Sequence, residues 1–156
     1  MLEVVPRSWV SRQFIVRNAE GTVADVNFAF WRERGRIKLG QDGFSVRREH
    51  AMRGRFLLEG PSGVVAEARK PSAWRNWFVV EYDGRRFDLR KRSAWFREFL
   101  LLDGARQIGS VASQSAWTRR ADARMPENWP FPVQLFVVWL VLAMWNREAA
   151  AAAAGS

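Results

Sequence analysis

Most of this chain is a succession of short segments in which apolar and polar residues alternate, the pattern of β-strands with one buried face. Two of the breaks between such segments are Asp42-Gly43 and Asp83-Gly84. Both predict hairpin turns, because glycine readily adopts the positive φ angle that tight hairpins require. The pattern predicts about eleven or twelve short strands before Asp122.

The strand pattern recurs with a period of about 43 residues. Two aromatic series mark this period: Phe14, Phe56 and Phe99, and Trp31, Trp74 and Trp117. Each unit is expected to form about four strands. The strands that open the units are expected at Gln13–Arg17, Arg55–Glu59 and Glu98–Leu102, and those that follow them at Thr22–Phe30, Val64–Arg69 and Gln107–Ser113.

The last apolar segment has a different character. Phe131–Trp145 contains one polar residue, Gln134, and a helix that is apolar on all sides must be buried in a protein core or in a bilayer. Such a helix spans about 22 Å, whereas the hydrocarbon core of a bilayer is about 30 Å thick. Burial inside the protein is therefore favoured. A membrane span or interfacial anchor and an oligomer contact are the alternatives.

One domain, residues 1–150, is expected for a chain of 156 residues. Within it, the prolines of Ala121–Pro132 predict a connector, and the helix is expected at about 132–150. Residues 151–156 are expected to form a flexible tail. A β-rich chain that ends in such a helix suggests a barrel closed around the helix. A β-propeller is the alternative, but three units are fewer than its ring requires.

The chain is strongly basic, with 25 Lys and Arg against 16 Asp and Glu and a formal charge of +9. All but Lys38, Lys70 and Lys91 of the basic residues are arginine. Arginine binds phosphate in a bidentate manner and stacks on aromatic rings, so the charge indicates an anionic partner, a phospholipid or a nucleic acid. Compositional bias of the genome is the alternative explanation for the ratio of Arg to Lys.

Two residue types limit the chemistry of the chain. It has no cysteine, which excludes disulfides, cysteine nucleophiles and S-palmitoylation. Its one histidine, His50, excludes metal sites with several histidines and is interpreted as incidental. Asp42, Asp83 and Asp103 each precede a glycine, so a turn role is favoured over acid–base catalysis. We therefore expect a protein that is not an enzyme and has no cofactor and no metal.

The strongest candidate site is a basic strand in which Phe87 and Leu89 are expected to face inward and their neighbours outward. An outward row of arginines could neutralise phosphate groups. With the matching positions of the preceding unit and of the preceding strand, the candidate binding residues are Arg86, Arg90, Arg92, Arg47, Arg48 and Arg75. The alternative is a solvated strand face whose charge is balanced by Asp88.

The tryptophans offer a second candidate site. Trp31, Trp74 and Trp117 could stack on nucleobases, as aromatic residues do on nucleic-acid-binding sheets. The alternative, which their regular spacing favours, is that they occupy equivalent core or rim positions.

The combination of repeated hairpins and an apolar C-terminal helix resembles the tubby-like superfamily, which includes the phospholipid scramblases and the LURP-one-related proteins. Phe14-Ile15-Val16 followed by Gly21 looks like the strand–turn–strand openings of that family, and Phe131–Trp145 is similar to its core helix. The resemblance covers Trp9 to Glu148. It implies a mainly β fold, a twelve-stranded antiparallel barrel wrapped around the helix, and binding of phosphoinositides or other phospholipids. No functional residue carries over, and the cysteine-rich segment of the scramblases has no counterpart.

From these observations we expect a cytoplasmic protein, peripheral to the membrane, that binds anionic phospholipid headgroups through an arginine-rich face. A nucleic-acid-binding module that uses arginine and exposed tryptophan is the alternative, as is a structural or protein-interaction domain. The identity of the ligand and the oligomeric state stay open.

Overall fold

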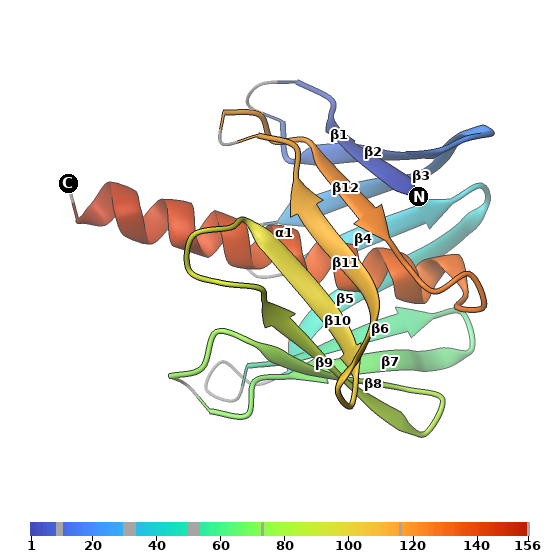
Figure 1. Ribbon diagram of the computed structural model, residues 1–156. Helices are drawn as coiled ribbons and strands as arrows, with labels where there is room; N and C mark the ends of the chain where they lie inside the picture. Colours follow the sequence, from blue (N-terminus) through green and yellow to red (C-terminus); the bar gives the residue numbers. More distant parts are fainter. Residues whose placement is uncertain (9–10, 30–33, 50–53, 73, 116, 156) are drawn as a thin grey trace.

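The computed structural model of the protein describes residues 1–8, 11–29, 34–49, 54–72, 74–115 and 117–155. Within these residues the chain forms twelve strands followed by one helix (Figure 1). The elements are β1 (Leu2–Pro6), β2 (Gln13–Asn18), β3 (Gly21–Ala29), β4 (Arg34–Leu39), β5 (Asp42–Glu49), β6 (Arg55–Gly60), β7 (Gly63–Arg69), β8 (Phe78–Tyr82), β9 (Arg85–Lys91), β10 (Glu98–Asp103), β11 (Arg106–Ser113), β12 (Ala121–Arg124) and α1 (Phe131–Ala154).

The strands form one closed antiparallel barrel. Each strand pairs with its neighbours in the sequence, and β1 closes the barrel by pairing with β12, where Leu2 lies opposite Ala123. Side chains alternate between the interior and the surface, as the pleat of a strand requires. In β9, for example, Phe87 and Leu89 are buried while the residues beside them face outward. The predicted fold class, a twelve-stranded antiparallel barrel with a C-terminal helix, is confirmed.

Helix α1 runs through the barrel, and its C-terminal end projects beyond the strands (Figure 1). Every residue from Val133 to Leu142 is buried, so inward-facing strand side chains enclose the helix on all sides. Among the described residues, α1 is also the one helix long and apolar enough to cross a bilayer. Its place inside the barrel accounts for this composition without a membrane.

The two ends of the barrel differ. We call the end with the short hairpin turns the closed end, because the segment 125–130 covers it. Trp129 of this segment is buried, and its ring packs against Tyr82 and Phe87 with centroids 5.3 Å and 4.8 Å away. The Nε2 of Gln134 in α1 donates a hydrogen bond of 2.7 Å to the carbonyl oxygen of Trp129. We call the opposite end, where α1 emerges, the mouth.

The six strands whose bounds were predicted begin and end within one residue of those bounds, apart from the predicted end at Phe30, which lies outside the described residues. The turn at Asp83-Gly84 is also confirmed, since Tyr82 pairs with Arg85 and both turn residues have positive φ angles. The turn predicted at Asp42-Gly43 is wrong. Leu39 pairs with Asp42, so the turn lies two residues earlier, at Gly40-Gln41, where Gly40 supplies a φ of +58°.

Two further predictions are wrong. Ala121–Pro132 is not connector throughout, because its first four residues form β12; the inward side chains there are alanines, which give a weak apolar signal. The helix does not end near residue 150, because α1 continues through Ala154, into the segment 151–156 that was expected to form a tail. Ser156 lies outside the described residues. Alanine has the highest helix propensity, and the six alanines extend the helix into solvent.

Candidate functional site: a cationic and aromatic mouth

The predicted arginines of β9 face outward, as expected, but each of them already has a carboxylate partner. The Nε of Arg86 lies 2.8 Å from Glu81 Oε1, and the Nη2 of Arg90 lies 3.0 Å from Asp88 Oδ2. The guanidinium of Arg90 also stacks on the ring of Trp77, with Cζ 4.0 Å from the ring centroid. Such pairing on exposed strands is typical of a solvated face that contributes little to stability.

The other predicted residues are spread around the barrel. The Nη1 of Arg92 lies 2.8 Å from Glu98 Oε2, and the Nε of Arg47 lies 2.8 Å from Glu59 Oε1. Arg47 and Arg48 are on β5, four strands from β9, and Arg48 is half-buried. Arg75 is exposed in the loop after β7 and has no ion pair within the described residues. The structure therefore does not gather the six arginines into one face.

What the structure does gather is a set of exposed tryptophans at the mouth. Trp74, Trp95 and Trp117 are 94%, 92% and 91% exposed, and they lie in the three loops that follow β7, β9 and β11. In an up-and-down barrel these three loops share one end. Phe96, beside Trp95, is exposed as well. Large apolar side chains that are fully exposed in a cluster mark an interaction surface.

Local hydrogen bonds of serine shape two of these loops. The Oγ of Ser93 accepts hydrogen bonds from the backbone N–H groups of Trp95 and Phe96. In the same way, the Oγ of Ser115 accepts hydrogen bonds from the N–H groups of Trp117 and the residue after it. Such turns hold the backbone while the tryptophan side chain points away from it.

The sequence carried a signal for these loops that the sequence analysis missed. The tripeptide Ser-Ala-Trp occurs three times, at 72–74, 93–95 and 115–117, and an arginine follows each copy within two residues. Because the copies are about half a repeat apart, they fall in consecutive loops at one end of the barrel. Trp74 and Trp117 therefore occupy rim positions, one of the two placements that the tryptophan spacing predicted. Trp31 and His50 lie outside the described residues.

Charge is divided between the two ends of the barrel. The described loop residues at the mouth are 7–8, 11–12, 54, 70–72, 74–77, 92–97, 114–115 and 117–120. They include eight cations and no carboxylate: Arg7, Arg12, Lys70, Arg75, Arg92, Arg97, Arg119 and Arg120. The described turn residues of the closed end include three carboxylates, Glu20, Asp83 and Glu127, and no cation. An electric field of this kind attracts anions to the mouth.

Several of the cations at the mouth lie over the aromatic rings that line the barrel there. The Cζ of Arg119 is 5.1 Å from the centroid of Phe14, and the Cζ of Arg97 is 5.2 Å from the ring of Trp145. Arg147, on α1, lies in the same way over Phe56, 5.9 Å away. These cation–π contacts hold positive charge against the apolar interior.

Partial desolvation of two of these cations, and of Lys70, has an electrostatic consequence. Desolvation lowers the pKa of Arg119 and of Arg147 below the ordinary arginine value. It also lowers the pKa of Lys70, and the nearby charge of Arg48 lowers it further. Arginine stays protonated in proteins, so Arg119 and Arg147 keep their positive charge at the mouth in spite of this desolvation.

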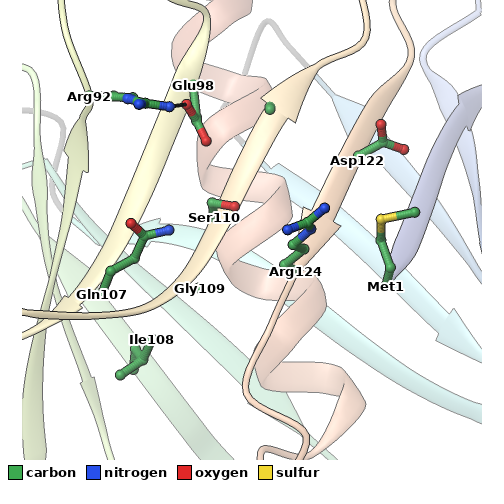
Figure 2. A pocket seen from close by; sticks show the side chains of 10 residues that line it. Met1, Arg92, Glu98, Gln107, Ile108, Gly109, Ser110, Asp122 and Arg124 are labelled. Atoms are coloured by element: carbon green, nitrogen blue, oxygen red, sulfur yellow. Dashed lines mark hydrogen bonds and ion pairs between the residues drawn. The ribbon is translucent and has the colours of Figure 1, made fainter.

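The outer surface has a larger hollow of about 740 Å³ beside β11 (Figure 2). Figure 2 shows Glu98 and Arg92 on one side of it and Asp122 and Arg124 on the other, with the small residue Ser110 at its base. Its positive and negative charges are balanced, so this hollow does not favour an anion. A smaller cavity of about 210 Å³ lies at the mouth between α1 and the loop after β11.

Within the described residues, no group of three or more His, Asp or Glu side chains could hold a metal ion. The candidate functional site is therefore the mouth, with its exposed tryptophans and its cations. No family model, curated protein or solved structure matches the chain.

Proposed function

We propose that the protein binds anionic phospholipid surfaces with the mouth of its barrel and performs no chemistry on them. The observation that carries this proposal is the coincidence at one end of three almost fully exposed tryptophans and eight cations, in loops whose described residues include no carboxylate. Tryptophan prefers the interface between water and hydrocarbon, and arginine pairs with lipid phosphates. The resemblance to tubby-like proteins supports the same class of ligand.

The expected free energies of binding suit peripheral attachment to a membrane surface. Transfer of a large apolar side chain from water contributes about 1.5–3 kcal/mol when its burial is complete. Each cation near an anionic membrane surface contributes about 1 kcal/mol. Neither contribution alone is strong, so we expect binding to need tryptophan insertion and anionic lipid together. The arginines on the strand faces, Arg86 and Arg47, have carboxylate partners, and so do two cations at the mouth, Arg7 and Arg92. The exposed tryptophans are therefore what favours the mouth over the predicted strand face.

Sedimentation with lipid vesicles tests this proposal. We expect the protein to bind vesicles of phosphatidylcholine with phosphatidylserine, to bind neutral vesicles weakly, and to dissociate as salt screens the charges. The triple variant Trp74→Ala, Trp95→Ala, Trp117→Ala should bind vesicles at least about tenfold more weakly. A tenfold change corresponds to a loss of about 1.4 kcal/mol of binding free energy, which is small for three tryptophan side chains. The three side chains are almost fully exposed, so the variant should fold normally.

Val64→Ala is the matched control, because Val64 is exposed near the closed end and is apolar. This variant should bind vesicles as the wild type does. Equal binding to neutral and anionic vesicles, or full binding by the triple variant, would contradict the proposal.

A nucleic-acid ligand would use the same charge but a different arrangement of rings. Base-stacking residues commonly lie on one strand face, where successive bases reach them. Here the exposed tryptophans occupy three separate loops, which suits shallow insertion into an interface better. Tight binding of a single-stranded oligonucleotide that competes with vesicles would favour the nucleic-acid function instead.

A further inference from the structure

The small cavity at the mouth combines an apolar base with a polar wall. Phe14, Leu142 and Trp145 supply apolar surface, and Trp145 is buried. Among the described residues that line the cavity, Arg97 and Arg119 are the charged ones, and none is a carboxylate. Two guanidinium groups in a cavity of this kind favour a negatively charged ligand.

Both arginines are held in place by contacts with the barrel. The Nη1 of Arg119 donates a hydrogen bond of 2.8 Å to the carbonyl oxygen of Ser11, and its guanidinium lies over Phe14. The carbonyl oxygen of Arg97 accepts a 2.9 Å hydrogen bond from the N–H of Ser113, and its guanidinium lies over Trp145. Positions fixed in this way reduce the entropy that a ligand must remove on binding.

The cavity also holds hydrogen-bonding groups besides the arginines. Within the part of the chain that the structure describes, the buried Nε1 of Trp145 has no acceptor for its hydrogen. Thr118 and Asn146 line the same cavity with a hydroxyl and an amide. The Nε1 of Trp145 is covered by protein atoms, so the hydroxyl and the amide are the groups that an anionic oxygen in the cavity could reach.

We propose that this cavity binds one phosphate ester group, and that the headgroup of a phospholipid with a single phosphate supplies it. The source of the phosphate rests on the proposed function, whereas the anion chemistry rests on the cavity alone. At about 210 Å³ the cavity is smaller than the roughly 300–1,000 Å³ of pockets for drug-sized ligands. Two guanidinium groups match the charge of one phosphate, not that of a headgroup with several.

The test compares a soluble phosphate ester with vesicles. Thermal unfolding of the full chain is measured with glycerol 3-phosphate and with chloride at the same ionic strength, because a ligand that binds only the native state raises the unfolding temperature. We expect glycerol 3-phosphate to raise this temperature for the wild type and for Arg75→Gln. Arg75 is exposed at the mouth and does not line the cavity.

For Arg97→Gln we expect the apparent affinity for glycerol 3-phosphate to fall at least tenfold, and for Arg97→Lys we expect an intermediate loss, because lysine keeps the charge without the bidentate geometry. Both Arg75→Gln and Arg97→Gln should weaken binding to vesicles that contain phosphatidic acid. Inositol trisphosphate should protect the wild type no better than glycerol 3-phosphate does.

The outcomes separate this inference from the proposed function. If vesicles bind but glycerol 3-phosphate stabilises no variant, or stabilises all of them equally, the cavity site is wrong and the proposed function stands. If glycerol 3-phosphate stabilises the protein through Arg97 but vesicles do not bind, the site takes a soluble phosphate ester and the proposed function is wrong. Binding of inositol trisphosphate through Arg97, tenfold tighter than glycerol 3-phosphate, would overturn the assignment to a single phosphate.

Discussion

At the scale of single residues, the fit between Gly35 and Trp139 decides whether the helix can sit in the barrel. Gly35 is a buried position of β4, and a Cβ there would lie 2.1 Å from Trp139 Nε1 and 2.8 Å from Cε2. Trp139 itself is 1% exposed and packs on Phe56, with centroids 5.5 Å apart. Neither residue has room to move without disturbing the core.

We expect Gly35→Ala to destabilise the protein by about 1–3 kcal/mol, the usual cost of overpacking a core. Urea unfolding measures this difference. Gly43→Ala is the control, because a Cβ at Gly43 meets nothing within 4 Å and its φ angle is not positive. A second substitution, Trp139→Phe, should remove part of the clash between the new Cβ and the indole ring. The double variant should therefore lose less unfolding free energy than the two single variants lose together. Equal stability of the two alanine variants would show that the packing is looser than described.

The charge of Lys70 gives a pH dependence with a definite sign. Burial, followed by the charge of Arg48, lowers the pKa of Lys70 below 10.5 in the folded state. In the interval between the lowered pKa and 10.5, the unfolded chain binds more protons than the folded chain, so stability rises with pH. We expect Lys70→Met to remove this part of the rise in chemical unfolding measured over the alkaline range. An unchanged alkaline profile in the variant would contradict the assignment to Lys70.

At the scale of elements, the sequence was most informative where periodicity and burial coincide. The bounds of six strands followed from alternating residues that lie between an apolar interior and water. Strand β12 escaped prediction because its inward residues are Ala121 and Ala123, and β1 escaped because it precedes the repeats. Both strands are short, and they pair with each other although they lie at opposite ends of the strand order. A contact between distant segments leaves little trace in local sequence.

The site was harder to predict than the strands. Outward-facing arginines are visible in the sequence, but their carboxylate partners are on neighbouring strands, as Glu81 is for Arg86 and Glu59 for Arg47. Which loops share one end of the barrel depends on the topology as a whole. The three Ser-Ala-Trp copies are the local signal that, combined with an up-and-down barrel, would have located the mouth.

The beginning of α1 depends on one polar side chain in an apolar helix. The Nε2 of Gln134 donates to the carbonyl oxygens of Trp129, at 2.7 Å, and of Pro126, at 3.3 Å. We expect Gln134→Leu to destabilise the protein by about 1–3 kcal/mol, because the buried acceptor loses its donor. Thermal unfolding measures this, and Gln41→Leu, at an exposed turn, should have little effect. If both variants unfold alike, the closed end is not held by this hydrogen bond.

At the scale of the whole molecule, the loops at the two ends of the barrel differ in their charge and in their exposed aromatic residues. Helix α1 emerges at the mouth (Figure 1), whose described loops carry cations and exposed tryptophans. The closed end is covered by a packed segment and carries carboxylates in its turns. A molecule with this asymmetry should approach an anionic surface in one orientation. Its resemblance to tubby-like proteins stays a prediction, whereas the polarity is a property of this chain.

A fluorophore placed at each end of the barrel tests most directly whether the mouth meets the membrane. The chain has no cysteine, so a single introduced thiol can be labelled selectively. Ala94 is exposed in the loop after β9 at the mouth, and Ser62 is exposed in a turn of the closed end. With anionic vesicles, we expect the emission of an environment-sensitive label at Ala94→Cys to shift to the blue while a label at Ser62→Cys does not change. A blue shift at Ser62→Cys alone, or at both positions equally, would contradict binding through the mouth.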